Sequence, residues 1–153
     1  MKNLANPADA ATLRTRIAAL QSTDQRRWGA MNVAQMVCHL ADAFAGPLGQ
    51  HPMRPSTAKR PPIPLGFYKW LAFNVPAPWP RGVRTIPEMD QQIGGTRPAV
   101  FKADRIRLFA RLETFTRFSG PWPNHPIFGA MNANEWMRWG YLHTDHHLRQ
   151  FGR

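Results

Sequence analysis

The chain has 153 residues, of which 43% are hydrophobic and 11% aromatic, and its formal net charge is +11. This length favours a single domain over residues 1–153 with one buried core. No apolar stretch reaches the ~18 residues of a membrane span, so we expect no membrane-spanning helix and no membrane partner.

Two further features of the composition bear on location and partners. Cys38 is the single cysteine, so no internal disulfide can form. Residues 1–10 lack the apolar region of a signal peptide, and we therefore expect a cytoplasmic protein. Lys and Arg are spread along the whole chain, which favours a solvated basic surface and leaves nucleic-acid binding as an alternative class.

The first two predicted helices are marked by asparagine caps. Asn6 precedes a helix over residues 7–21, in which apolar residues recur every three or four positions: Ala10, Leu13, Ile17 and Leu20. Asn32 precedes a second helix that ends near Leu48, and Gln35 completes a capping box with this asparagine.

Residues 46–98 form a proline-rich connector, which holds 11 of the 15 prolines and seven Lys or Arg against two acidic residues. Proline excludes most of it from regular structure, apart from a short helix over residues 65–75 and a helical turn at residues 85–88. A connector of this length indicates a lid or a crossover, here a basic one. His51 and His125 lie among prolines, and we expect both side chains to face solvent.

Two long helices are predicted after the connector, over residues 98–118 and 132–150. The second follows the sequence Gly-Ala-Met-Asn, as does the helix that begins after residues 29–32, and both have Gln or Glu three positions after the asparagine. No segment shows the alternation of a strand. We therefore predict the all-α class, as a four-helix bundle whose long connector lets its second and third helices run parallel.

Three histidines in these helices are candidate metal ligands. His143 and His147 are four residues apart, so a helix places both rings on one face, which is typical of two ligands to one metal ion. If the second and fourth helices are antiparallel, a rise of ~1.5 Å per residue brings His39 level with His143. We predict a three-histidine metal site of His39, His143 and His147; the plainer alternatives are a core histidine and a surface pair.

Neighbouring side chains are candidates for supporting roles. Gln35 and Asp42 flank His39 by about one helical turn, and either could orient its second ring nitrogen, as metal-bound histidines require. Asp42 could also be a fourth ligand or a base. Gln150, three residues after His147, is a further candidate support.

The last helix places other residues around the predicted site. Trp136 and Trp139 are expected to wall it, and Gly140 is expected to allow close approach by a neighbour or a substrate. His146 is expected at the rim of the site. Asp145 lies ~200° round the helix from the paired histidines and is expected to point away.

Two segments resemble a known family. His143–Gln150, with the sequence HTDHHLRQ, is similar to the last helix of the DinB/YfiT-like superfamily of metal-binding four-helix bundles, and residues 31–42 are similar to its second helix. A branch of that superfamily, mostly of unknown function, resembles the chain more closely through His125–Gly129 and Trp139–Gly152.

The resemblance has implications for the site, the fold and the chemistry. The family's ligands fall on His39, His143 and His147, and its following glutamine falls on Gln150. The family implies an up-down-down-up bundle, a zinc or nickel ion, a homodimer, and transfer or isomerisation chemistry with low-molecular-weight thiols. This chain has Leu148–Arg149 where the family usually has Arg-Gly, a departure that bears on thiol binding rather than on the ligands.

A metal-dependent enzyme is the leading functional hypothesis. Three neutral imidazoles leave a coordination position open, as in catalytic zinc sites. Binding of a thiol would make the protein a thiol S-transferase acting on a small molecule, which the resemblance favours, whereas activation of water would make it a hydrolase. The basic connector would suit an anionic substrate. A non-catalytic metal-binding bundle is the third alternative.

Overall fold

The computed structural model describes residues 1–57 and 62–153, which contain five α-helices and two short 3-10 turns. The helices are α1 (Pro7–Ala18), α2 (Val33–Ala45), α3 (Leu65–Asn74), α4 (Phe101–Arg117) and α5 (Ala133–Gln150). No β-strand occurs in these residues, and one isolated bridge pairs His125 with Gly129. The predicted all-α class is confirmed.

The starts of α2 and α5 are set by two complete capping boxes. Asn32 accepts the N–H of Gln35 at 2.9 Å and donates its own N–H to the Gln35 side chain at 2.9 Å; Asn132 and Glu135 repeat both bonds at 2.9 Å. The glycine three positions before each asparagine has a positive φ, of 80° and 67°, a conformation that glycine adopts without steric cost. The repeated Gly-Ala-Met-Asn sequence is therefore one helix-entry device used twice.

The helix after the connector begins later than predicted. α4 starts at Phe101 rather than Pro98, because the Asp104 side chain accepts the N–H of Ala99 at 2.9 Å. Val100 is consequently extended, with φ −113° and ψ 113°. The Asp104 side chain in the first turn of α4 thus holds the chain just before the helix in this extended entry.

The connector between α2 and α4 contains the two helical elements that its sequence predicts. They are α3 and the 3-10 turn η2 (Pro87–Met89); a second 3-10 turn, η1 (Gly46–Leu48), directly extends α2. Residues 58–61 of the connector lie outside the described residues.

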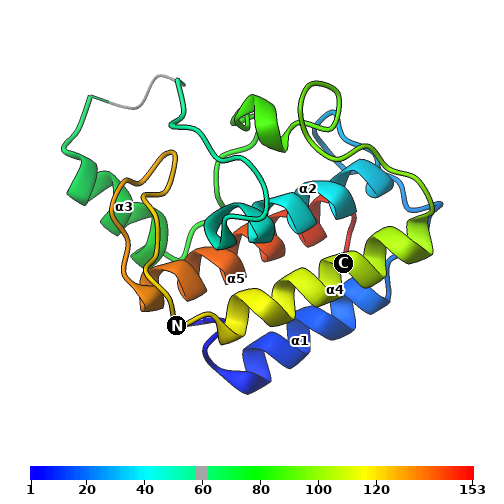
Figure 1. The fold of residues 1–153 in the computed structure, drawn as a ribbon, viewed down its shortest axis with the longest axis horizontal. Coiled ribbons are helices and arrows are strands. Elements are labelled where there is room, and N and C mark those ends of the chain that lie inside the picture. The colour runs from blue at the N-terminus through cyan, green and yellow to red at the C-terminus, as the bar shows by residue number, and fades with distance from the viewer. Residues whose placement is uncertain (58–61) are drawn as a thin grey trace.

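The four long helices α1, α2, α4 and α5 lie side by side (Figure 1). α1 and α5 run in one direction, and α2 and α4 run in the other. α2 packs against α4 and α5, and α1 packs against the same two helices from the other side. α3 lies beside one end of α5. The parallel run of α2 and α4 agrees with the long connector that joins them.

The core lies between these four helices, and each contributes side chains spaced mostly three or four residues apart. The largest buried apolar side chains include Leu13, Ile17, Met36, Leu40, Phe44, Leu108, Leu112, Phe115, Trp136 and Leu148. Gly140 belongs to this core, because a Cβ there would lie 2.7 Å from Leu4, 3.1 Å from Phe115 and 3.2 Å from Phe44. Core neighbours, not a substrate, therefore use the close approach expected at Gly140.

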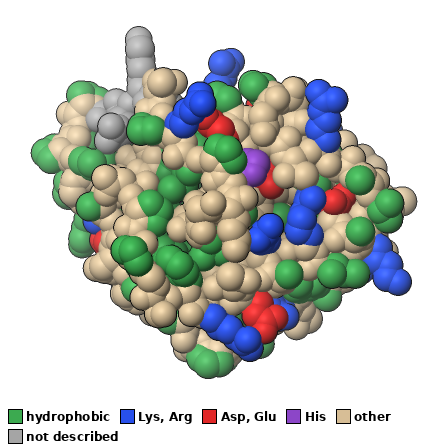
Figure 2. Space-filling view, viewed as in Figure 1, with side chains coloured by type: hydrophobic (Ala, Val, Ile, Leu, Met, Phe, Trp, Pro, Cys, Tyr) green, Lys and Arg blue, Asp and Glu red, His purple; other side chains and the backbone are tan. Residues whose placement is uncertain are grey.

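The surface agrees with dispersed charge. On the face shown in Figure 2, Lys and Arg side chains are scattered between neutral and apolar areas and do not gather into one basic patch. Within the described residues, no helix has both the length and the apolar character that crossing a membrane requires.

Candidate functional site

The rings of His39, His143 and His147 meet where α2 passes α5. Nε2 of His39 lies 3.1 Å from Nε2 of His143, and the three ring centroids are 4.7 to 5.1 Å apart. One potential ligand atom from each ring lies within 4.8 Å of the other two. α5 supplies two rings from one face, and the antiparallel run of α2 brings the third ring level with them.

The contact between the two Nε2 atoms restricts what can lie there. Two nitrogen lone pairs repel each other at 3.1 Å, so either one nitrogen carries a proton or both bind one cation. Zinc–nitrogen bonds of 2.0–2.1 Å place two tetrahedral ligands ~3.3 Å apart. The 3.1 Å between two uncharged nitrogens is close to that distance, and a third imidazole lies beside them, an arrangement that suits a divalent ion that prefers imidazole.

The other nitrogens of two rings have protein partners. His39 Nδ1–H donates to the carbonyl oxygen of Met89 at 2.8 Å, and His147 Nδ1–H donates to Oε1 of Gln150 at 3.0 Å. Each bond fixes the tautomer and leaves Nε2 free to face the cluster. His143 Nδ1 is buried and has no hydrogen-bond partner among the described residues.

Gln150 also ties α5 to the loop before α2. Its Nε2 donates to the carbonyl oxygen of Trp28 at 2.7 Å. Gly29 has a φ of +80°, and a Cβ there would lie 2.3 Å from that same nitrogen, so a larger residue would strain the backbone and displace the Gln150 side chain. The partner of His147 is thus itself held in place.

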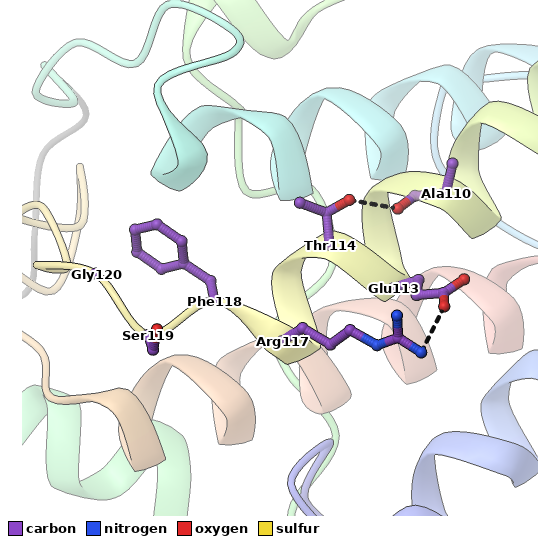
Figure 3. A pocket seen from close by; sticks show the side chains of 7 residues that line it. All are labelled: Ala110, Glu113, Thr114, Arg117, Phe118, Ser119 and Gly120. Atoms are coloured by element: carbon purple, nitrogen blue, oxygen red, sulfur yellow. Dashed lines mark hydrogen bonds and ion pairs between the residues drawn. The ribbon is translucent and has the colours of Figure 1, made fainter.

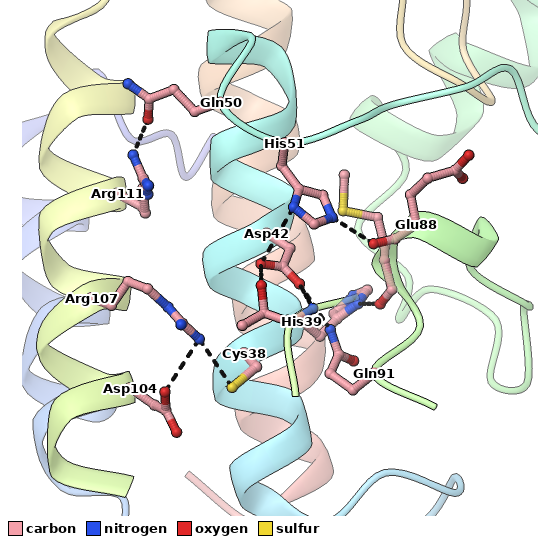
Figure 4. Close-up of polar contacts among 12 residues, drawn as sticks. Cys38, His39, Asp42, Gln50, His51, Glu88, Gln91, Asp104, Arg107 and Arg111 are labelled. Carbon is pink, nitrogen blue, oxygen red and sulfur yellow. Dashed lines mark hydrogen bonds and ion pairs between the residues drawn. The ribbon is translucent and has the colours of Figure 1, made fainter. Parts of the chain in front are cut away.

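Neither side chain that was predicted to orient His39 is the partner of its Nδ1. Gln35 is used in the capping box of α2. Asp42 faces the connector, where its carboxylate accepts the N–H of Thr96 at 2.7 Å and Nε2–H of Gln91 at 3.2 Å (Figure 4). The backbone carbonyl of Met89 orients the ring instead, and a carbonyl has no signature in the sequence. Asp42 also stands outside the group of close ligand atoms, which does not support a fourth-ligand role.

Burial lowers the pKa of all three rings. The pKa of His39 lies below its ordinary value of 6.5 because the ring is buried. The pKa values of His143 and His147 are lowered further, first by burial and then by the neighbouring imidazoles. All three rings are therefore neutral at pH 7, which is the form that binds a metal ion.

Aromatic side chains border the cluster. Trp139 stacks on His143, with ring centroids 4.9 Å apart and planes at 16°. The ring centroid of Trp79, in the connector, lies 6.4 Å from that of His143 and 6.4 Å from that of His146. Trp136, which was also expected to wall the site, is fully buried one layer further in and packs on Trp139.

A cation completes this border. The guanidinium of Arg81 lies 4.2 Å above the ring of Trp28, which in turn lies 6.1 Å from the ring of His146. No carboxylate of the described residues forms an ion pair with Arg81. We call these four partly or fully exposed residues the rim: Trp28, Trp79, Arg81 and His146.

The expectation that His51 and His125 face solvent is wrong. His125 is 7% exposed, and its Nδ1 accepts the N–H groups of Ile127 at 3.0 Å and Phe128 at 3.3 Å. Burial lowers the pKa of His125 to about 3. His51 is half-buried, and its Nε2–H donates to the carbonyl oxygen of Glu88 at 2.6 Å. The prolines beside both residues belong to ordered loops in which the two histidine side chains are partly or fully buried.

Cys38, next to His39 in sequence, points to a different side of α2. Its sulfur is buried and lies 3.2 Å from Nη2 of Arg107 on α4 (Figure 4). Burial raises the pKa of this thiol to about 11, so it stays protonated at neutral pH. The thiol is therefore a core group.

A surface groove lies away from the histidines, at the end of α4 (Figure 3). Its lining residues are Ala110, Glu113, Thr114, Arg117, Phe118, Ser119 and Gly120. An exposed ion pair of 2.9 Å between Glu113 and Arg117 is its main polar feature. The groove contains no histidine or cysteine, so its shape alone does not make it the candidate site.

The second half of the chain matches a known family. Residues 80–153 match the family described as "Protein of unknown function (DUF1569)". The match includes His143 and His147 and excludes His39. Comparisons with curated proteins and with solved structures found no match. Membership of the DinB-like superfamily remains an expectation from the sequence.

The buried His125 predicts an acid-sensitive fold. Its folded pKa of about 3 lies below the ordinary 6.5, so the unfolded chain binds its proton first as the pH falls. The free energy of unfolding should therefore drop from pH 6.5 towards pH 3. His125→Asn keeps an acceptor for Ile127 but does not titrate. It should therefore reduce the pH dependence of the free energy of unfolding by an amount equivalent to at most about one bound proton. Denaturant titrations across this range, with chelator present, measure the slope; parallel profiles for the two proteins would contradict the assignment.

Proposed function

We propose that the chain binds a divalent metal ion, zinc or nickel, through Nε2 of His39, His143 and His147. The observation that carries the proposal is the 3.1 Å separation of two ring nitrogens beside a third neutral imidazole. The hydrogen bonds from His39 and His147 to their outer partners support it, because they occupy Nδ1 of each ring and leave Nε2 free to bind an ion.

We propose further that the bound ion serves catalysis. A divalent ion held by three imidazoles keeps a coordination position open and acts as a Lewis acid toward a thiol or a water molecule. The surrounding residues have separate tasks. Burial keeps the ligand rings unprotonated, and Trp79 and Trp139 limit the access of bulk water to His143.

The favoured reaction is thiol S-transfer to a small molecule, with hydrolysis as the alternative. The resemblance to DinB-like proteins supports the thiol, and the parallel run of α2 and α4 is compatible with that family's up-down-down-up connectivity. A metal-binding bundle without catalysis is the further alternative.

The rim favours an anionic substrate. Arg81 is exposed, stacks on Trp28 and has no carboxylate partner among the described residues. A guanidinium in this position is available to a carboxylate, and its charge-assisted hydrogen bonds exceed those between neutral groups. Trp79 offers an apolar surface beside His143 and His146. A thiol that bears a carboxylate would satisfy both features.

The ligand assignment predicts which histidines retain metal. Wild-type protein should contain about one zinc or nickel ion per chain, and His39→Ala or His147→Ala should lose it, because two imidazoles alone do not make a stable site. His146→Ala is the matched control, since its ring lies 5.2 Å from that of His147 on the same helix and it should keep the ion. Elemental analysis after dialysis gives the content. Full retention in either ligand variant would remove the proposal.

The substrate assignment predicts a charge-dependent effect of Arg81→Gln. With mercaptosuccinate as thiol and an aryl chloride as acceptor, the KM for the thiol should rise roughly 10-fold with kcat little changed, because a binding contact is lost. The neutral thiol 2-mercaptoethanol should show no change, nor should Arg84→Gln with either thiol. Equal losses with both thiols would contradict an anion site at Arg81. Turnover of esters alone would favour the hydrolase, and metal binding without turnover would favour the non-catalytic bundle.

A further inference from the structure

A buried carboxylate lies one helical turn beyond His39. Asp42 is 4% exposed, and the connector supplies its hydrogen-bond donors: the N–H of Thr96 at 2.7 Å, the Thr96 hydroxyl at 2.7 Å and Nε2 of Gln91 at 3.2 Å. Nδ1 of His51 lies 3.9 Å from the same group. A buried charge is costly unless it is met in this way. Asp42 therefore anchors one particular segment of the connector to α2.

The anchored segment carries the hydrogen-bond partner of His39. η2 ends at Met89, and the Met89 carbonyl oxygen accepts from His39 Nδ1–H at 2.8 Å. Of the two anchored residues, Gln91 lies in the turn that follows Met89, and Thr96 comes directly after that turn (Figure 4 shows Asp42, Gln91 and His39 together). The position of the carbonyl is thus set by the position of this turn.

Residues 87–95 behave as one piece. The Asp90 carbonyl accepts N–H groups from Ile93 at 2.9 Å and Gly95 at 2.8 Å, and the Pro87 carbonyl accepts that of Gly94 at 3.1 Å. A Cβ on Gly95 would lie 2.9 Å from the backbone of Asp90, so the turn closes only with glycine there. Because these bonds fix the turn internally, a displacement of Gln91 should also displace Met89.

A second contact holds the same turn. His51 Nε2–H donates to the Glu88 carbonyl oxygen at 2.6 Å, directly before Met89. His51 follows η1 at the end of α2, so both contacts connect the turn to the helix that carries His39. Asp42 on α2 and His51 shortly after η1 therefore both hold this turn against the same end of the fold.

From this chain of contacts we propose that Asp42 is a positioning residue for the metal site. It neither binds the ion nor touches His39 Nδ1; it holds residues 87–96 so that the Met89 carbonyl keeps His39 in the tautomer with Nε2 unprotonated. The inference rests on the proposed function for its metal, but the tautomer is a property of the metal-free protein as well.

The test compares Asp42→Asn with Asp104→Asn. Asp104 is a matched control, since it is also 4% exposed and also accepts a backbone N–H near the end of the connector, from Ala99 at 2.9 Å. Asn at position 42 presents an NH₂ group to donors, which loosens the turn. Nitrogen-15 NMR of the metal-free proteins reports the His39 tautomer, with His39→Gln for assignment, and competition with a chelator reports zinc affinity.

Wild-type protein and Asp104→Asn should show His39 protonated at Nδ1. Asp42→Asn should show a mixture of tautomers and a 10- to 100-fold weaker affinity for zinc. Thr96→Val, which removes one donor and keeps the backbone N–H, should shift both readouts in the same direction by less, and it serves if Asp42→Asn does not fold. The same tautomer and affinity in the variants at Asp42 and Asp104 would overturn the inference. Absence of zinc binding in wild-type protein would remove the proposed function, and the tautomer would still decide the role of Asp42.

Discussion

The candidate metal site depends first on the contact between Nε2 of His39 and Nε2 of His143. Two ring nitrogens 3.1 Å apart need a proton or a cation between them, and the third ring of His147 completes a nitrogen donor set. The fold produces this contact because α2 and α5 run antiparallel and both begin at an asparagine capping box. The starts of these two helices thus set the height at which the rings meet.

The connector is part of the site rather than a spacer. It supplies the Met89 carbonyl that orients His39, the Trp79 ring that borders His143, and the Arg81 guanidinium at the rim. Its prolines remove backbone donors and fix local conformation, so few chain conformations compete with the one that makes these contacts. A long loop that performs several such tasks is typical of a functional loop.

Much of the fold follows from patterns that depend on neighbours in sequence. The long helices, the caps at Asn32 and Asn132, and the shared face of His143 and His147 come from spacings of three and four residues. The meeting of His39 with that pair follows once the helices are taken as antiparallel.

The hydrogen-bond partners of the site residues could not be predicted, because they depend on residues distant in the chain. Asp42 and Gln35 have the right spacing to hydrogen-bond His39. The Gln35 side chain instead accepts the N–H of Asn32 in the capping box, and the Asp42 carboxylate accepts the N–H of Thr96 in the connector. The acceptor that serves His39 is a backbone carbonyl, which every residue has. His125 is buried against Trp136 and Trp139 of α5, which are distant in the chain. Its ring also accepts N–H groups two and three residues ahead. The glycine four residues later, where the chain turns back in a bridge, is the local signal for this turn.

We propose that three imidazoles from two helices share one divalent ion. The most direct measurement is an anomalous difference map from crystals grown with zinc and recorded on both sides of its absorption edge. We expect one peak per chain, within about 2.1 Å of Nε2 of His39, His143 and His147. A map with no peak among these three nitrogens, from crystals that bind zinc elsewhere or not at all, would contradict the claim.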